Sequence, residues 1–423
     1  MEVNKIDLDN GLRIIYDFNP GVKTVTIVVV VKVGSRDEEN EEHGLAHFVE
    51  HLLFKKNSVR KIDDIYREID KLGGDLDAFT TREATYFTLK ILKAYFSEGI
   101  KLLSDIILRP EFSEEEIELE KMVVKEEIRM YRDSPEDIVF DNFFKASWGK
   151  HPLVREILGT EESISNFSKD LILNFYSKHY IPQKTIIGVS GDIFLGRMKE
   201  IFEEYFGFYN KDNIEINSNG KIPQFKPKVV TQKRSFEQIH LVWGTEGYKI
   251  KDPKRVPLSL LSMSLGGGLS SRLFKELREK RGLVYNVETH LISFRDATLF
   301  GIYTATTPKY FKETFYALLE EREKLLKDGI NKEELDLAKK QCINSFLMGL
   351  ESPTQRLFYL LDSFLIYGKI IPWIEKIKNI RKIQLNEIDE TIKDIFSKPF
   401  SMSLVGPINS DLREFLEGGE KYD

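Results

Sequence analysis

The pattern of hydrophobic and polar positions predicts strands and helices in the same order twice along the chain. An alternating run at 3–8, a turn at 9–11 and a second run at 12–16 predict a β-hairpin at the start. The β-branched run 24–33 predicts a buried strand. The hydrophobic pattern of later segments in the first half predicts three helices, at 44–54, 93–108 and 113–132. It also predicts strands at 84–92 and 184–189.

The second half repeats landmarks of the first half at a nearly constant spacing. The segment 295–300 resembles the segment 82–87 and lies 213 residues further on. The pair Ser352-Pro353 lies 218 residues after the pair Ser134-Pro135. Several such matches in the same order indicate an internal duplication. Because each half mixes strand hairpins with long helices, we predict an α+β fold of two homologous domains. Each domain should pack its helices on one face of a mainly antiparallel sheet.

A polar segment separates the two halves. It covers about 210–228 and contains Asn, Gly and Pro throughout, a composition typical of a linker. We therefore predict an N-terminal domain at 1–212, a linker at 213–230 and a C-terminal domain at 231–423. A chain of 423 residues is long enough for two domains of that size.

Composition excludes several classes of protein. Hydrophobic residues make up 41% of the chain, which is enough apolar material for packed cores and excludes a disordered chain. A net charge of −6 lacks the basic character of a nucleic-acid-binding protein. The single cysteine, Cys342, excludes an intrachain disulfide and a cysteine-based metal site. The first residues show no targeting segment and the apolar runs are too short to cross a bilayer, so we expect a cytoplasmic protein with no membrane or nucleic-acid partner.

The pentad at 47–51 reads H-F-V-E-H and carries the candidate chemistry. On a helix, His47 and His51 are one turn apart and share a face, so their imidazoles can bind one Zn²⁺. Glu50 flanks the same face, where it can take a proton from a metal-bound water. The alternative interpretation is a helix with two half-buried histidines and no metal.

A hydrolytic zinc site needs three protein ligands and one open position. The predicted helix at 113–132 offers Glu120, Glu126 and Glu127. Glu120 and Glu127 are two helical turns apart and share a face, which suits one metal ligand and one carboxylate that orients a histidine. The spacing alone does not choose between Glu126 and Glu127, and a solvated helix face is the alternative for each of these glutamates.

The segments 34–38 and 44–55 together resemble the inverted zinc-binding signature of the pitrilysin/insulinase family of metallopeptidases. That resemblance implies Glu127 as the third zinc ligand, because the segment 123–128 matches the context of the family's ligand. It also implies Glu120 as an auxiliary catalytic glutamate one heptad earlier. The cofactor implied is one Zn²⁺ per chain.

The resemblance extends over nearly the whole chain. The segment 73–80 resembles the family's substrate-binding edge strand, which implies substrate-binding roles for Asp77, Ala78, Phe79 and Thr80. The family usually has Asn where this chain has Asp77, and an ionised Asp only accepts hydrogen bonds.

A second element of the family is found in the C-terminal half. The segments 271–274 and 278–285 resemble the element that carries the family's Arg/Tyr pair, which implies that Arg278 and Tyr285 contact the substrate or the oxyanion. From the residues alone, a basic helix end and a core tyrosine are the simpler interpretation of this pair.

The duplication tests the metal assignment. At an offset of 214, the three residues of the pentad correspond to Leu261, Ser264 and Leu265. At an offset of 218, Glu120 and Glu127 of the predicted helix at 113–132 correspond to Ala338 and Ser345. The second copy has therefore lost every metal-binding group, so the N-terminal domain is predicted to be the catalytic, zinc-binding one.

These expectations define the predicted function. The chain should be a zinc-dependent endopeptidase that hydrolyses short or unfolded peptides in an enclosed chamber, with Glu50 as the general base on a zinc-bound water. The resemblance implies a chamber of four such domains, hence a homodimer or a heterodimer with an inactive homologue. The alternatives are a non-catalytic homologue that serves as a structural or assembly subunit of a larger complex, and a structural metal-binding module.

Overall fold

The computed structural model describes residues 2–209 and 222–417. The chain forms two compact units, and neither is continuous in sequence. The first unit contains Met1–Met130, Arg155–Asn219 and Gly349–Leu365, and the second contains Tyr131–Val154, Gly220–Met348 and Ile366–Asp423. The linker predicted at 213–230 falls largely on residues 210–221, which lie outside the described residues, so the boundaries at 1–212 and 231–423 stay a prediction.

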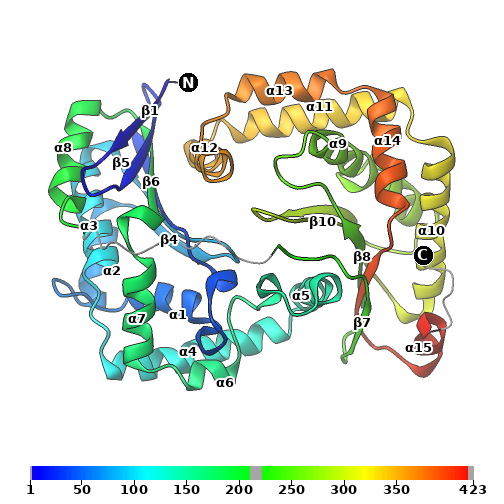
Figure 1. The fold of residues 1–423 in the computed structure, drawn as a ribbon, viewed down its shortest axis with the longest axis horizontal. Helices are drawn as coiled ribbons and strands as arrows, with labels where there is room; N and C mark the ends of the chain where they lie inside the picture. Colours follow the sequence, from blue (N-terminus) through cyan, green and yellow to red (C-terminus); the bar gives the residue numbers. More distant parts are fainter. Residues whose placement is uncertain (1, 210–221, 418–423) are drawn as a thin grey trace. The chain divides into compact units, whose positions relative to one another are not determined.

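The first unit is built on a six-stranded sheet (Figure 1). Its strands in chain order are β1 (Glu2–Asp7), β2 (Arg13–Phe18), β3 (Thr24–Val31), β4 (Asp75–Thr80), β5 (Thr85–Leu92) and β6 (Thr185–Gly191). Their order across the sheet is β1-β2-β6-β3-β5-β4. All neighbours are antiparallel except β2 and β6. The β-branched strand β3 lies inside the sheet and is almost wholly buried, whereas β4 forms an edge.

The second unit repeats this path with five strands. They are β7 (Val229–Lys233), β8 (Ile239–Glu246), β9 (Val287–Ser293), β10 (Thr298–Thr306) and β11 (Ser401–Gly406), in the order β7-β11-β8-β10-β9. Again one pair is parallel, β7 with β11, and it corresponds to β2 with β6. Each strand of the second sheet thus has a counterpart in the first. The predicted α+β class, with mainly antiparallel sheets and an internal duplication, is confirmed.

Helices cover the sheets of both units (Figure 1). In the first unit they are α1 (Leu45–Leu53), α2 (Ile62–Leu72), α3 (Phe96–Leu108), α4 (Glu114–Arg132), α6 (Glu161–Ser165), α7 (Lys169–His179) and α8 (Leu195–Phe206). In the second unit they are α9 (Arg255–Gly266), α10 (Phe311–Asp328), α11 (Lys332–Gly349), α13 (Trp373–Lys382), α14 (Leu385–Phe396) and α15 (Ser410–Glu417), with a π-helix at Phe274–Lys280. Helices α1 and α4 confirm the two helices predicted to carry the site. Among residues 2–209 and 222–417, no helix has both the length and the apolar character needed to cross a bilayer.

Two further helices, α5 (Pro135–Trp148) and α12 (Pro353–Tyr367), belong to the unit opposite to the one that their sequence position suggests. Helix α5 packs on β8 and β11 of the second sheet. Helix α12 packs in the first unit, where Arg356 donates two hydrogen bonds, 2.7 and 2.9 Å long, to the buried carboxylate of Asp17 on β2. The two helices begin at the duplicated Ser-Pro pairs, so each copy of the repeat contributes the same element to the other unit.

Candidate metal centre

The start of α1 is fixed by a buried carboxylate. Both oxygens of Glu38 accept backbone N–H groups, from Gly44 and Ala46, at 2.9 Å each. Gly44 has a φ of 91°, and a Cβ there would lie 2.7 Å from the carbonyl oxygen of Leu158. Only glycine fits this left-handed, crowded position. The cap therefore begins the helix two residues before His47 and sets the direction in which the pentad faces.

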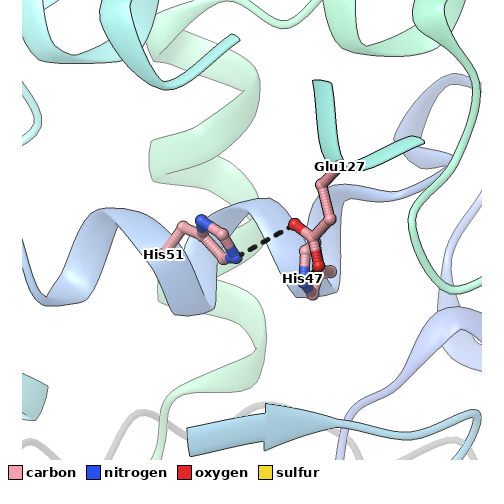
Figure 2. A group of neighbouring side chains, drawn as sticks. All are labelled: His47, His51 and Glu127. Atoms are coloured by element: carbon pink, nitrogen blue, oxygen red, sulfur yellow. Dashed lines mark ion pairs between the residues drawn. The ribbon is translucent and has the colours of Figure 1, made fainter. Parts of the chain in front are cut away.

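The pentad brings two imidazoles together, and α4 adds a carboxylate. The ring centroids of His47 and His51 are 4.4 Å apart. Glu127 lies opposite them, with Oε1 3.7 Å from Nε2 of His47 and Oε2 3.6 Å from Nε2 of His51 (Figure 2). One ligand atom from each of the three residues lies within 4.8 Å of the other two.

These distances fit a metal ion better than direct hydrogen bonds. The separations between nitrogen and oxygen are too long for hydrogen bonds. Two ligands of a tetrahedral zinc, with bonds of about 2.0–2.1 Å, are about 3.3 Å apart. Two histidines and a glutamate also leave the open coordination position that a hydrolytic zinc site requires. The residues present therefore fit the zinc ion that the sequence predicts.

Glu120 fixes the tautomer of His51. Its side chain is almost wholly buried, and Oε1 lies 2.7 Å from Nδ1 of His51. Oε2 lies 2.6 Å from Nζ of Lys55. Burial alone would raise the pKa of Glu120, but the hydrogen bonds from His51 and Lys55 hold that pKa below its usual value. Because the ionised carboxylate of Glu120 can only accept, His51 donates its Nδ1 proton, and the lone pair of Nε2 stays available for a metal ion held between His51 and Glu127.

His47 is held in its neutral form. Burial, followed by the neighbouring His51, lowers the pKa of its imidazole to about 3. A neutral imidazole is the form that binds a metal. Its Nδ1 is buried and has no hydrogen-bond partner among the described residues.

Helical spacing alone did not decide which of two adjacent glutamates is the metal ligand, and the structure distinguishes them. Glu127 faces the histidines. Glu126 is exposed and forms an ion pair with Arg129 one turn later on α4. The two side chains project about 100° apart around the helix, so only one of them can face α1.

Glu50 lies beside this group on α1, and its carboxylate is also buried. Its Oε2 accepts a hydrogen bond of 2.5 Å from the hydroxyl of Thr80. Burial raises the pKa of Glu50 to about 7, although the bond from Thr80 opposes that rise. A carboxylate with a pKa near neutrality is suited to general acid–base chemistry.

The predicted substrate-binding segment forms strand β4. Its side chains alternate, so that Asp77 and Phe79 are exposed and Thr80 is buried. Ala78 is half-buried, and its N–H donates to the side chain of Asp77. The strand pairs with β5 and stands at the end of the strand order, so one edge is unpaired within the described sheet. An unpaired edge is the feature that an extended peptide can join.

Arg278 and Tyr285 lie together in the second unit. The guanidinium of Arg278 lies 4.6 Å from the centre of the Tyr285 ring and 4.7 Å from that of Phe274. Tyr285 is 75% exposed, which excludes the interpretation as a core tyrosine. The roles of this pair toward a substrate stay predictions.

The counterparts of the metal ligands in the second unit do not form a site. Leu261 and Leu265 belong to the hydrophobic core of that unit. Within the described residues, His47, His51 and Glu127 are the single group of three such side chains close enough to hold an ion.

Four contacts of this site were not predicted from the sequence. They are the bonds from Lys55 to Glu120, from Thr80 to Glu50, and from Gly44 and Ala46 to Glu38. Lys55 stands four residues after His51, just past the end of α1, so its closeness in sequence was the one signal that pointed toward this group.

Two family models of known proteins match most of the length of this chain. Residues 13–161 match the insulinase domain of peptidase family M16, and residues 166–342 match the inactive domain of the same family. An uncharacterized zinc protease of Bacillus subtilis, YmxG, is 32% identical over 405 residues, which cover 96% of this chain and 98% of the relative. An uncharacterized zinc protease of Mycobacterium leprae is 33% identical over 412 residues, which cover 96% of this chain and 92% of the relative.

Two solved structures share the fold. A protease from Helicobacter pylori has a TM-score of 0.87 at 24% identity, with 96% of this chain and 99% of that chain covered. A peptidase M16 inactive domain protein from Pseudomonas fluorescens has a TM-score of 0.88 at 19% identity, with 97% and 98% covered.

Proposed function

Because the chain belongs to peptidase family M16, we propose that it is a zinc-dependent endopeptidase that hydrolyses short or unfolded peptides. The observation that carries this proposal is the convergence of His47, His51 and Glu127, with Glu50 beside them. A closed structural zinc site has four protein ligands, whereas this group offers three and leaves one position open. The intact ligand set also favours a catalytic chain over a non-catalytic assembly subunit.

Each side chain of the site has its own role in the proposed hydrolysis. A zinc ion held by His47, His51 and Glu127 would supply Lewis acidity toward water and the scissile carbonyl. Glu120 keeps His51 in the tautomer that offers Nε2. Glu50 takes a proton from the attacking water and gives it to the nitrogen of the leaving amine, so that the carboxylate is regenerated after each cycle.

Substrate binding is assigned to β4 and to the second unit. An extended peptide would add to the free edge of β4 near Asp77, Ala78 and Phe79 through main-chain hydrogen bonds. Arg278 and Tyr285 would donate to the substrate or to the oxyanion, since the guanidinium is always charged and the phenol is exposed.

We further propose that two chains enclose the chamber, as a homodimer with two active sites. A heterodimer with an inactive homologue is the alternative. The peptide substrate, the chamber and the cytoplasmic location stay predictions.

Zinc stoichiometry combined with cleavage of a quenched peptide library tests the function. Wild type should bind one zinc per chain and cleave peptides, whereas Glu50→Gln should bind the same amount of zinc and cleave far more slowly. Stoichiometric zinc with no cleavage of any library member by wild type would contradict the proposal and favour the structural alternative.

A further inference from the structure

Thr80 lies on β4, the strand predicted to bind substrate. Its side chain is turned to Glu50, the candidate general base, and not outward from the free edge of the strand. Thr80 is 8% exposed and its hydroxyl oxygen lies 2.5 Å from Oε2 of Glu50. We infer that Thr80 is a positioning residue, which holds the carboxylate of Glu50 in one orientation and makes no side-chain contact with substrate. This inference rests on the proposed role of Glu50 as the general base.

The direction of the hydrogen bond follows from the neighbouring hydroxyl. Thr85 stands opposite Thr80 on β5, with the two hydroxyl oxygens 3.4 Å apart. Thr85 donates its single hydroxyl proton to the carbonyl oxygen of Val33 at 2.9 Å. That proton is therefore not available for Thr80. The hydroxyl of Thr80 directs its own proton to Oε2 of Glu50 at 2.5 Å, because the alternative acceptor, the hydroxyl oxygen of Thr85, lies 3.4 Å away. An ionised carboxylate only accepts, so Thr80 is the donor in this pair.

The backbone around Thr80 is fixed by a tight connection between β4 and β5. The N–H of Thr81 donates to the carbonyl oxygen of Ala84 at 2.8 Å, and the hydroxyl of Thr81 accepts from the N–H groups of Glu83 and Ala84. Thr80 thus presents its hydroxyl from a rigid hairpin end, while Glu50 comes from α1. A base held by a fixed donor stays aligned with the water that it must deprotonate.

The arrangement also assigns different roles to the two carboxylate oxygens. Thr80 donates to Oε2 of Glu50, so Oε1 keeps both of its lone pairs and is the oxygen assigned to receive and release the proton. A glutamate without this bond could rotate about its side-chain torsions and would spend less time in the productive orientation.

Three variants test the inference. Thr80→Val keeps the shape and removes the hydroxyl, whereas Thr80→Ser keeps the hydroxyl. Thr245→Val is the matched control, because Thr245 is a buried threonine of the second sheet that donates to the carbonyl oxygen of Pro399 at 2.8 Å. We expect kcat of Thr80→Val to fall about ten- to a hundredfold, with KM and zinc affinity within about twofold of wild type. Thr80→Ser and Thr245→Val should stay within about threefold of wild-type kcat.

A double-mutant cycle makes the test specific. If Thr80 acts only through Glu50, adding Thr80→Val to Glu50→Gln should produce no further loss of kcat. A higher KM at unchanged kcat would make Thr80 a substrate-binding residue and overturn the inference. Full and independent losses in the double variant would overturn it as well.

A structural measurement separates this inference from the proposed function. Crystal structures of wild type and Thr80→Val, each loaded with zinc, should show one carboxylate conformer for Glu50 in wild type and a displaced or split conformer in the variant. This readout needs no peptidase activity. An unchanged Glu50 in the variant would overturn the role of Thr80 even in an active enzyme.

Discussion

The imidazole of His51 donates its Nδ1 proton to Oε1 of Glu120 across 2.7 Å. This bond links α1 to α4, and Lys55 contacts the other carboxylate oxygen at 2.6 Å. The buried carboxylate therefore joins a candidate metal ligand to a cation without contacting the metal position itself. A partner of this kind orients the ligand and raises its basicity.

Glu120→Gln should weaken zinc binding about ten- to a hundredfold, because the neutral amide no longer holds the Nδ1 proton of His51 as a charged acceptor does. Competition with a chromophoric chelator measures this change. Glu118→Gln is the control, since Glu118 is exposed on the same helix and pairs with Lys121. Equal zinc affinities for wild type and Glu120→Gln would contradict the role given to this carboxylate.

Glu127→Gln should lower zinc bound per chain from about one toward zero at micromolar metal, since a metal site of three protein ligands loses its only anionic one. Glu126→Gln should leave zinc binding unchanged, because its side chain faces Arg129 and solvent. Metal analysis after gel filtration distinguishes the two variants. The opposite pattern would show that the other glutamate is the ligand.

Glu50→Gln should lower kcat/KM for peptide cleavage about 10²- to 10⁴-fold, the range that a positioned general base supplies. Zinc binding should stay stoichiometric, because Glu50 is not among the three side chains that converge on the metal position. Progress curves on a quenched peptide, paired with metal analysis, test both parts. Activity close to that of wild type would exclude Glu50 as the base.

His179 should make the first unit sensitive to mild acid. It lies at the end of α7 and is 4% exposed. Burial, followed by the charges of Lys184 and Lys178, lowers the pKa of its imidazole to about 3. The unfolded chain binds this proton near pH 6.5 and the folded chain does not. The stabilisation is therefore complete above pH 6.5 and is lost as the pH falls below that value, by about 2 kcal/mol at pH 5.

Urea denaturation at several pH values, with wild type and His179→Leu, measures this effect. The free energy of unfolding of wild type should fall more steeply between pH 7 and pH 5 than that of the variant. Parallel curves would show that the folded protein protonates His179 as readily as the unfolded chain does.

Mixed dimers test whether the Arg/Tyr element serves the partner's metal centre. Chains carrying Glu50→Gln and chains carrying Tyr285→Phe are each expected to have low activity as homodimers. If Tyr285 acts across the dimer, a mixed dimer contains one site with neither substitution, so activity should return to a fraction of the wild-type value. A mixture no more active than its parents would place Tyr285 in the site of its own chain or outside any site.

The sequence by itself determined the local parts of the site. Helical periodicity requires that His47 and His51 share a face and that Glu50 flanks it, since residues three and four apart are neighbours on any α-helix. The duplicated pattern likewise determined the two similar α+β units and the loss of ligands from the second copy. These conclusions depend on short-range geometry or on comparison of the chain with itself.

Tertiary structure decided what depends on how elements pack. The spacing within α4 did not decide whether Glu126 or Glu127 is the third metal ligand. The rotation of that helix against α1 turns Glu127 toward the histidines. Thr80 belongs by sequence to a predicted substrate strand, but the closing of the β4–β5 hairpin turns its hydroxyl to Glu50.

The packing of helices α5 and α12 was likewise decided by the tertiary structure and not by the sequence alone. Each carries buried apolar residues, and its sequence position suggests one unit while its packing places it in the other. A pattern of hydrophobic positions specifies that a face must be buried, whereas the partner that buries it is chosen by the packing of the whole chain.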